Sequence, residues 1–167
     1  GIEQAYITTI HSYTTDQSLH DQPHRDLRRA RSPAQSIIPT TTGAAKALTK
    51  IFPSLAHVIG GCGIRVPVAN GSLTDITFNV SKPTSITEVN ERFRNISENK
   101  LKNVLFYTED PIVSIDINNS SYSCTFDSQM TSVIGKMVKV IGWYDNETGY
   151  SSRIIDVMEL LMNKNYV

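Results

Sequence analysis

Short hydrophobic runs recur along this chain, and amphipathic or alanine-rich segments separate them. The first run, residues 5–10, becomes polar at His11, so this imidazole should stand at the end of a strand. Further strands are expected over residues 57–66, 72–80, 104–107, 112–117, 122–126 and 137–143. Helices are expected over residues 44–52, 86–99 and 151–163. This succession predicts an α+β fold with a mainly antiparallel mixed sheet and helices on one face.

The expected helices differ in how much of their surface is hydrophobic. Residues 86–99 begin with the capping box Ser85–Glu88 and carry one apolar face, which is typical of core packing. Residues 151–163 are apolar on nearly every side. A helix of this kind needs a covering surface, and we expect that surface to be absent from this chain or supplied by another copy.

A long irregular stretch follows His11 and extends to about residue 35. Its charges include Asp16, Asp21, Arg29 and Arg31, interleaved with proline and leucine. A solvated charged linker is one interpretation. We favour a functional loop packed on its own side chains, because loops of this length without regular structure are usually disordered or functional.

Several features of the sequence are suited to binding an anion. Thr41, Thr42 and Gly43 precede a helix, whose first N–H groups and dipole favour phosphate. Arg65 stands in an apolar strand, where a guanidinium needs an anionic partner. With Thr14, Arg29 and the proton-transferring side chain of His11, these residues favour chemistry on a phosphorylated small molecule.

Composition limits the alternatives. The chain has 167 residues, 40% of them hydrophobic, and no net charge, so nothing favours nucleic acid as a partner. No membrane-spanning run or signal peptide is recognised, and no metal site is expected. Cys62 and Cys124 lie far apart and suit a reducing compartment, so we expect a cytoplasmic protein. Because the chain begins with Gly1 rather than Met, we expect a piece of a longer protein.

The order of the polar motifs resembles one enzyme family. The motifs are TTIHSYT (residues 8–14), DLRRAR (26–31), IIPTTTGAAKA (37–47), RVP (65–67) and WYDNETGY (143–150). Together they resemble the catalytic half of phosphorylating glyceraldehyde-3-phosphate dehydrogenase. The resemblance runs through essentially the whole chain.

The resemblance implies roles for individual residues. His11 would be the acid/base that activates the catalytic cysteine and assists hydride transfer. The substrate phosphate would be bound by Thr14, Asp16, Arg29 and Arg65, with Arg28 as the adjacent alternative to Arg29. The attacking inorganic phosphate would be bound by Thr42, Gly43 and again Arg65. Asn146 would bind the nicotinamide carboxamide of NAD, with Tyr150 close by.

Two features of the family are missing from this sequence. It contains neither the Ser-Cys-Thr-Thr-Asn motif of the nucleophile nor the Gly-x-Gly-x-x-Gly fingerprint of a dinucleotide site. The resemblance therefore implies a catalytic domain over residues 1–150 and a C-terminal helix, residues 151–167, that belongs to a missing NAD-binding domain. The intact enzyme would be a homotetramer acting on glyceraldehyde 3-phosphate and inorganic phosphate. The isolated chain should bind but not turn over.

Two alternatives remain open. An erythrose-4-phosphate dehydrogenase of the same superfamily is one, although the segment from Thr42 to Lys46 favours glyceraldehyde 3-phosphate by resemblance. A non-catalytic oligomerisation or phosphate-binding module is the other. The coding sequence upstream of Gly1 would separate an enzyme from such a module.

Overall fold

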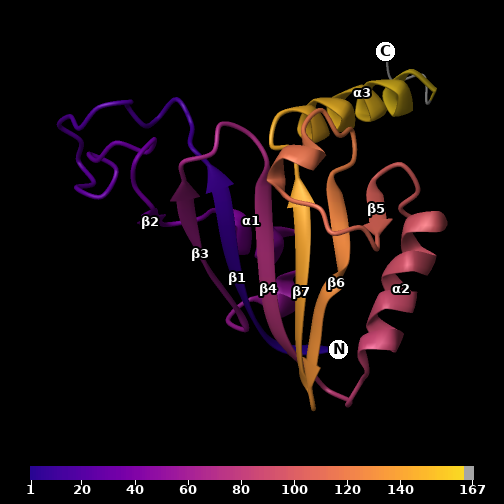
Figure 1. Ribbon diagram of the computed structural model, residues 1–167. Helices are drawn as coiled ribbons and strands as arrows, with labels where there is room; N and C mark the ends of the chain where they lie inside the picture. Colours follow the sequence, from indigo (N-terminus) through magenta and orange to yellow (C-terminus); the bar gives the residue numbers. More distant parts are fainter. Residues whose placement is uncertain (164–167) are drawn as a thin grey trace.

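The fold is a single seven-stranded sheet with helices packed against it (Figure 1). The computed structural model describes residues 1–163. The strands are β1 (Ile2–Ser12), β2 (Ile38–Thr40), β3 (Ile59–Val66), β4 (Ser72–Val80), β5 (Leu105–Thr108), β6 (Cys124–Ile134) and β7 (Met137–Tyr144). The helices are α1 (Ala44–Ile51), α2 (Ile86–Glu98) and α3 (Thr148–Asn163), with short 3-10 turns η1 (Pro53–Leu55) and η2 (Ser114–Ile117).

The sheet has the strand order β2-β3-β1-β4-β7-β6-β5. β1 pairs with β3 and β5 pairs with β6 in parallel, whereas β1–β4, β2–β3, β4–β7 and β6–β7 are antiparallel. The expected α+β fold with a mainly antiparallel mixed sheet is therefore confirmed.

One face of the sheet carries both α1 and α2. Val89, Phe93 and Ile96 of α2 pack on a core formed by Leu105, Phe126, Val138 and Val140. The rings of Phe93 and Phe126 stack with centroids 4.0 Å apart. The strand register places Gly61 and Gly63 of β3 on this same face, and the residues that lead into α1 lie directly over them. The predicted placement of these helices on one face is thus confirmed, while α3 lies across the ends of β6 and β7 (Figure 1).

Local signals explain where two helices begin. The capping box of α2 is present, because the Ser85 hydroxyl accepts from the Glu88 N–H and the Glu88 carboxylate accepts from the Ser85 N–H. α3 begins three residues earlier than expected, at Thr148. The carboxylate of Asp145 accepts from the N–H groups of Glu147 and Thr148, both at 2.8 Å, and so caps this end.

The prediction of a strand over residues 112–117 is wrong. These residues form an irregular segment followed by η2. The Asp116 carboxylate accepts from the Val113 N–H at 2.7 Å, and this local hydrogen bond competes with a sheet ladder. Val113 and Ile115 are exposed, so the hydrophobic run does not mark a buried strand.

The long segment between β1 and β2 contains no helix or strand and is held by its own side chains. The Asp21 carboxylate accepts from Arg31 Nε at 2.9 Å and from the Ser32 N–H at 2.8 Å. The Ser32 hydroxyl donates to the Leu19 carbonyl at 2.6 Å. Pro33 is fully buried. These contacts agree with a loop packed on its own side chains.

Candidate functional site

The parallel pairing of β1 with β3 brings the two most informative residues of the sequence side by side. In the register of these strands, His11 lies opposite Arg65 and Ser12 lies opposite Val66. β4 begins and β7 ends at the same end of the sheet, where Ser72 pairs with Tyr144. Side chains from four strands, β1, β3, β4 and β7, therefore lie close together at this end.

His11 has a defined tautomer. Its Nδ1 lies 2.7 Å from the Ser12 carbonyl oxygen, and because a carbonyl can only accept, Nδ1 carries the proton. Nε2 is then left as the acceptor. Burial lowers the pKa of His11, the nearby charge of Arg65 lowers it further, and the hydrogen bond to Ser12 partly opposes both effects. A neutral imidazole with a free Nε2 is the form that can act as a general base.

The ring of Tyr144 limits the freedom of this imidazole. The two ring centroids are 6.1 Å apart and the planes meet at 75° in an edge-on arrangement. His11 is half-buried between this ring and its strand neighbours. The imidazole is therefore held in position on a rigid strand rather than on a loop.

Arg65 is a half-buried cation without an acidic partner. Its Nη1 donates to the Ser12 carbonyl at 2.9 Å, and among the described residues it forms no ion pair. Burial, followed by the charge of Arg29, lowers the pKa of Arg65, and the charges of Tyr144 and Asp16 oppose this only in part. A guanidinium in this situation favours a bound anion, because an anion would compensate both effects. The binding of an anion by Arg65 stays a prediction.

Arg29 is already engaged within the protein. Its Nη1 contacts the Asp16 carboxylate at 2.5 Å, while Nε and Nη2 donate to the Thr40 hydroxyl at 3.1 and 2.7 Å. In this structure Asp16 therefore forms an ion pair with Arg29. Through Asp16, Arg29 and Thr40 the long loop is attached to β2. Arg28 is exposed, and its guanidinium makes no hydrogen bond or ion pair within residues 1–163. Of the two adjacent arginines, the structure turns Arg29 towards the sheet.

The predicted residues Thr14, Thr42 and Gly43 are not joined to Arg65 among the described residues. Thr42 accepts from the Ala44 N–H at 3.2 Å, and Gly43 is the N-cap of α1. Thr42 lies beside Gly61, four residues before Arg65 in β3 and therefore roughly 13 Å away along the strand. The Thr14 carbonyl accepts from Gln17 in a tight turn. No hydrogen bond of the described chain links these three residues to Arg65.

Asn146 is brought to the site, whereas Tyr150 is not. The side-chain oxygen of Asn146 accepts from the Ser12 hydroxyl at 3.0 Å and from the Ser72 hydroxyl at 3.1 Å. Its Nδ2 has no partner among the described residues. An amide held in this way can donate to another amide, such as the carboxamide of nicotinamide. Tyr150 lies on α3 with 71% of its surface exposed, and within residues 1–163 its side chain forms no hydrogen bond or ion pair.

The sequence predictions omitted four polar residues that hold the predicted residues in place at this end of the sheet. Ser12 and Ser72 hold Asn146, Tyr144 contacts His11, and Thr40 holds Arg29. Each stands next to a predicted residue or at a strand end, which is the only signal for them in the sequence. Their partners are distant along the chain, so only the sheet register identifies their roles.

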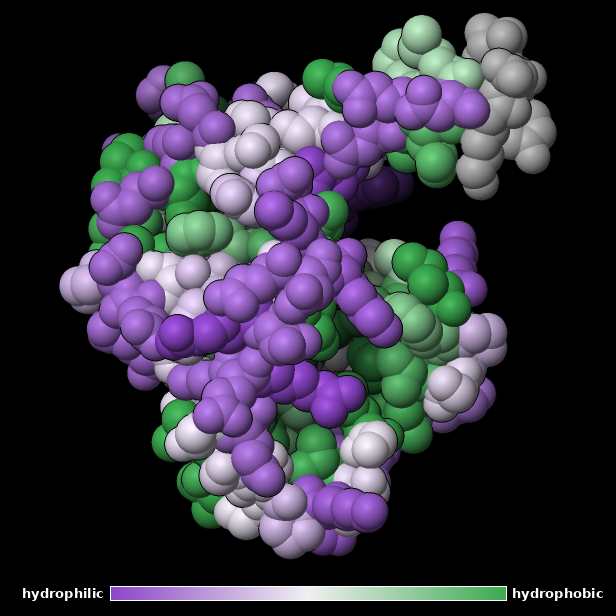
Figure 2. Space-filling model, turned by 90° about the vertical axis from the view of Figure 1, so that its right-hand side faces the viewer, coloured by the Kyte–Doolittle hydropathy of each residue, from purple (hydrophilic) through white to green (hydrophobic). Residues whose placement is uncertain are grey.

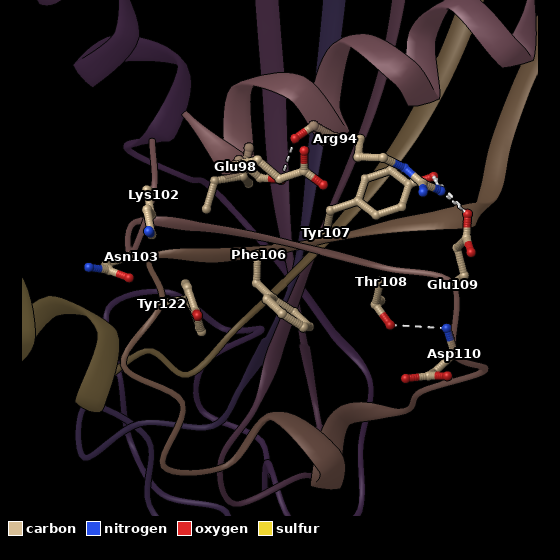
Figure 3. A pocket seen from close by; sticks show the side chains of 12 residues that line it. Arg94, Glu98, Lys102, Asn103, Phe106, Tyr107, Thr108, Glu109, Asp110 and Tyr122 are labelled. Carbon is tan, nitrogen blue, oxygen red and sulfur yellow. Dashed lines mark hydrogen bonds and ion pairs between the residues drawn. The ribbon is translucent and has the colours of Figure 1, made fainter. Parts of the chain in front are cut away.

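Two cavities of the molecule lie away from His11. One, of about 480 Å³, lies between α2 and β5 (Figure 3), and there Arg94 contacts Glu109 and lies over the Tyr107 ring. The other separates α2 from the start of β1. Neither includes His11. Within residues 1–163, no cluster of acidic, histidine or cysteine side chains could hold a metal ion. None of the helices in this part of the chain has the length and hydrophobicity that a membrane span requires.

α3 leaves its hydrophobic side chains uncovered. Figure 2 shows this helix projecting from the body of the molecule with hydrophobic surface upon it. Its exposed residues are Ile154, Ile155, Val157, Met158, Leu160, Leu161 and Met162. Exposed apolar surface of this extent marks a contact site. The expectation of a helix without its covering surface agrees with the structure up to residue 163, and residues 164–167 lie outside the described part.

Comparison with known proteins identifies close relatives. Residues 1–146 match the family model described as glyceraldehyde 3-phosphate dehydrogenase, C-terminal domain. The chain is 52% identical to glyceraldehyde-3-phosphate dehydrogenase 2 of Streptomyces avermitilis over 165 residues, which is 98% of this chain and 49% of the relative. It is 49% identical to glyceraldehyde-3-phosphate dehydrogenase of Geobacillus stearothermophilus, with the same coverage. The chain thus spans about half the length of the curated relatives it matches.

Proposed function

This chain belongs to the glyceraldehyde 3-phosphate dehydrogenase C-terminal domain family, and from that premise we propose that it is the substrate-binding half of the phosphorylating enzyme. The reaction would convert glyceraldehyde 3-phosphate, inorganic phosphate and NAD to 1,3-bisphosphoglycerate and NADH. The observation that carries this proposal is the arrangement at Ser12, where one carbonyl fixes a neutral imidazole beside an unpaired guanidinium.

His11 would move the proton in this reaction. Its Nε2 would take the proton of a cysteine thiol, and the thiolate would attack the aldehyde carbon. After hydride transfer, phosphate would attack the resulting thioester and release the acyl phosphate. The nucleophile would come from outside the described residues: Cys62 lies near Thr8 on the opposite face of the sheet from His11, and Cys124 is partly buried against Gly142.

Arg65 would bind the anionic groups of the substrates. It is half-buried, forms no ion pair within residues 1–163 and stands beside His11, so a phosphate held by it would place the aldehyde near Nε2. We propose that Thr14, Asp16 and Arg29 complete the substrate-phosphate site and that Thr42 and Gly43 serve the attacking phosphate. Arg29 would keep Asp16 and Thr40 as partners and order the loop around that site.

Asn146 would hold NAD through its carboxamide, with Tyr150 near the cofactor. When bound, NAD would accept the hydride. The role of this chain is to orient that group: Ser12 and Ser72 fix the side chain of Asn146, and its free Nδ2 suits a carboxamide carbonyl. His11 and Asn146 both contact Ser12, so the base and the cofactor contact would share one support.

The uncovered hydrophobic surfaces support a larger assembly. We propose that residues 1–150 form the catalytic domain and that the C-terminal segment, residues 151–167, belongs to a nucleotide-binding domain. The exposed apolar side chains of α3 support this assignment. Ile10, Ile64 and Leu73 are only partly buried on the sheet face opposite the helices, which supports contact with another subunit, and we propose that the intact enzyme is a homotetramer.

The test is enzyme activity of the full-length gene product. NADH formation is measured with glyceraldehyde 3-phosphate, phosphate and NAD, and His11→Asn should reduce kcat by about 100- to 10,000-fold. The matched control is His20→Gln, because His20 is an exposed loop histidine. Equal activity of His11→Asn and the unsubstituted enzyme would refute the proposal. Higher kcat/KM for erythrose 4-phosphate would favour the alternative substrate, and the isolated 167-residue chain should form no NADH.

A further inference from the structure

Asp145 is a buried carboxylate that accepts four hydrogen bonds, all at 2.8 Å. Only 2% of its surface is exposed. Oδ1 accepts from the N–H groups of Glu147 and Thr148, and Oδ2 accepts from the Asn119 N–H and the Asn70 side-chain amide. Both oxygens are therefore fully used, and neither is free to contact a substrate.

These donors come from three separate parts of the chain. Asn70 belongs to the turn between β3 and β4, and it also accepts from the Gly71 N–H at 2.8 Å. Asn119 follows η2 and has a positive φ of 64°. Glu147 immediately precedes α3, and Thr148 is its first residue. One carboxylate thus joins two turns and a helix at the same end of the sheet as His11.

The charge of Asp145 strengthens this junction. Burial alone would raise its pKa, but the three N–H donors and the Asn70 amide outweigh burial, and the pKa is lowered. The carboxylate therefore stays ionised at neutral pH and makes charge-assisted hydrogen bonds. A neutral isostere would have only one acceptor oxygen for these donors.

The position of Asp145 in the chain links this junction to the site. It follows Tyr144, whose ring contacts His11, and it precedes Asn146, whose side chain is held by Ser12 and Ser72. The serines fix the amide group of Asn146, but its backbone is fixed through the neighbouring carboxylate. We propose that Asp145 is a positioning residue that orients Asn146 towards the nicotinamide ring, an inference that rests on the proposed function.

The experiment measures ligand binding by the full-length protein. Isothermal titration calorimetry gives the Kd for NAD and for ADP-ribose, which lacks the nicotinamide ring. Asp145→Asn should raise the Kd for NAD about 10- to 100-fold, as loss of an orienting residue does at metal sites. The Kd for ADP-ribose should change less than about twofold, because this ligand makes no contact with Asn146.

Asp127→Asn is the matched control. Asp127 is also buried, with 3% of its surface exposed, and accepts from the Gln129 N–H at 3.2 Å and from Trp143 Nε1 at 3.1 Å. This variant should lower the Tm yet leave both Kd values within about twofold of the unsubstituted protein, because it lies outside the junction. A purely structural role of Asp145 would make the two variants behave alike.

Asn70→Ala keeps the proposal testable if Asp145→Asn does not fold. It removes one of the four donors and should raise the Kd for NAD about threefold to tenfold, with ADP-ribose unaffected. An unchanged Kd for NAD in the folded variant would overturn the inference, as would an equal rise for both ligands. Failure of the unsubstituted protein to bind NAD would refute the proposed function as well.

Discussion

The imidazole of His11 and the guanidinium of Arg65 donate to the same oxygen, the carbonyl of Ser12, at 2.7 and 2.9 Å. The shared acceptor fixes the tautomer of one residue and the position of the other. It also places a positive charge beside a group whose pKa that charge lowers. The acid/base properties of His11 and the anion affinity of Arg65 are therefore coupled, and a change in one should be measurable in the other.

Substitution of Arg65 should alter both binding and the pH profile. In Arg65→Gln, the KM for the phosphorylated aldehyde should rise about 10- to 100-fold, since a charge-assisted hydrogen bond contributes about 1.5–3 kcal/mol. Loss of the cation should also raise the pKa of His11, so the acidic limb of the kcat/KM profile moves to higher pH. Arg31→Gln, which removes an exposed guanidinium paired with Asp21, should change neither quantity. An unshifted acidic limb would contradict the coupling.

Acid should destabilise the protein partly through His11. The folded-state pKa of His11 lies below its usual value of 6.5, so below about pH 6.5 the unfolded chain binds a proton that the folded chain does not. Stability is therefore retained above pH 6.5 and falls as the pH drops towards the folded-state pKa. His11→Gln should show a smaller difference in Tm between about pH 7.5 and 5.5. Equal Tm differences before and after the substitution would disprove this contribution.

Thr40 should control the order of the long loop. Thr40→Val removes the acceptor of two Arg29 donors and should cost about 1–3 kcal/mol locally. Trypsin cleavage after Arg25, Arg28 or Arg31 should then accelerate about fivefold or more, as followed by mass spectrometry. The control Thr87→Val makes the same substitution at an exposed position of α2, and it should leave the cleavage rate of the loop unchanged.

Cys124 should be an unreactive thiol. Burial raises its pKa to about 11, against an ordinary value of 9.0, which lowers the thiolate fraction about 100-fold at neutral pH. Iodoacetamide should therefore modify Cys62 before Cys124 in the folded protein. Peptide mapping of the Cys62→Ser and Cys124→Ser variants gives the two rates separately. Faster modification of Cys124 would show that the packing around Gly142 opens readily.

The sequence predicted well wherever a local signal was sufficient. The capping box of α2 and the helix at Ala44 follow from side chains within one turn of each other. Local signals misled at residues 112–117, where apolar residues suggested a strand but Asp116 stabilises a 3-10 turn. The start of α3 was placed late because its cap, Asp145, is held in place by the distant residues Asn70 and Asn119.

The order of residues alone reveals which chemical groups the chain carries: a histidine at a strand end, an arginine within an apolar strand, and an asparagine before the last helix. How these groups interact follows from the packing of the folded chain. Parallel pairing of β1 with β3 sets His11 beside Arg65, whereas Arg29 is taken up by Asp16 and Thr40. Side-chain hydrogen-bond partners here lie 11 to 134 residues apart in sequence, and they meet only when the sheet and its connecting segments are in place, which no local pattern encodes.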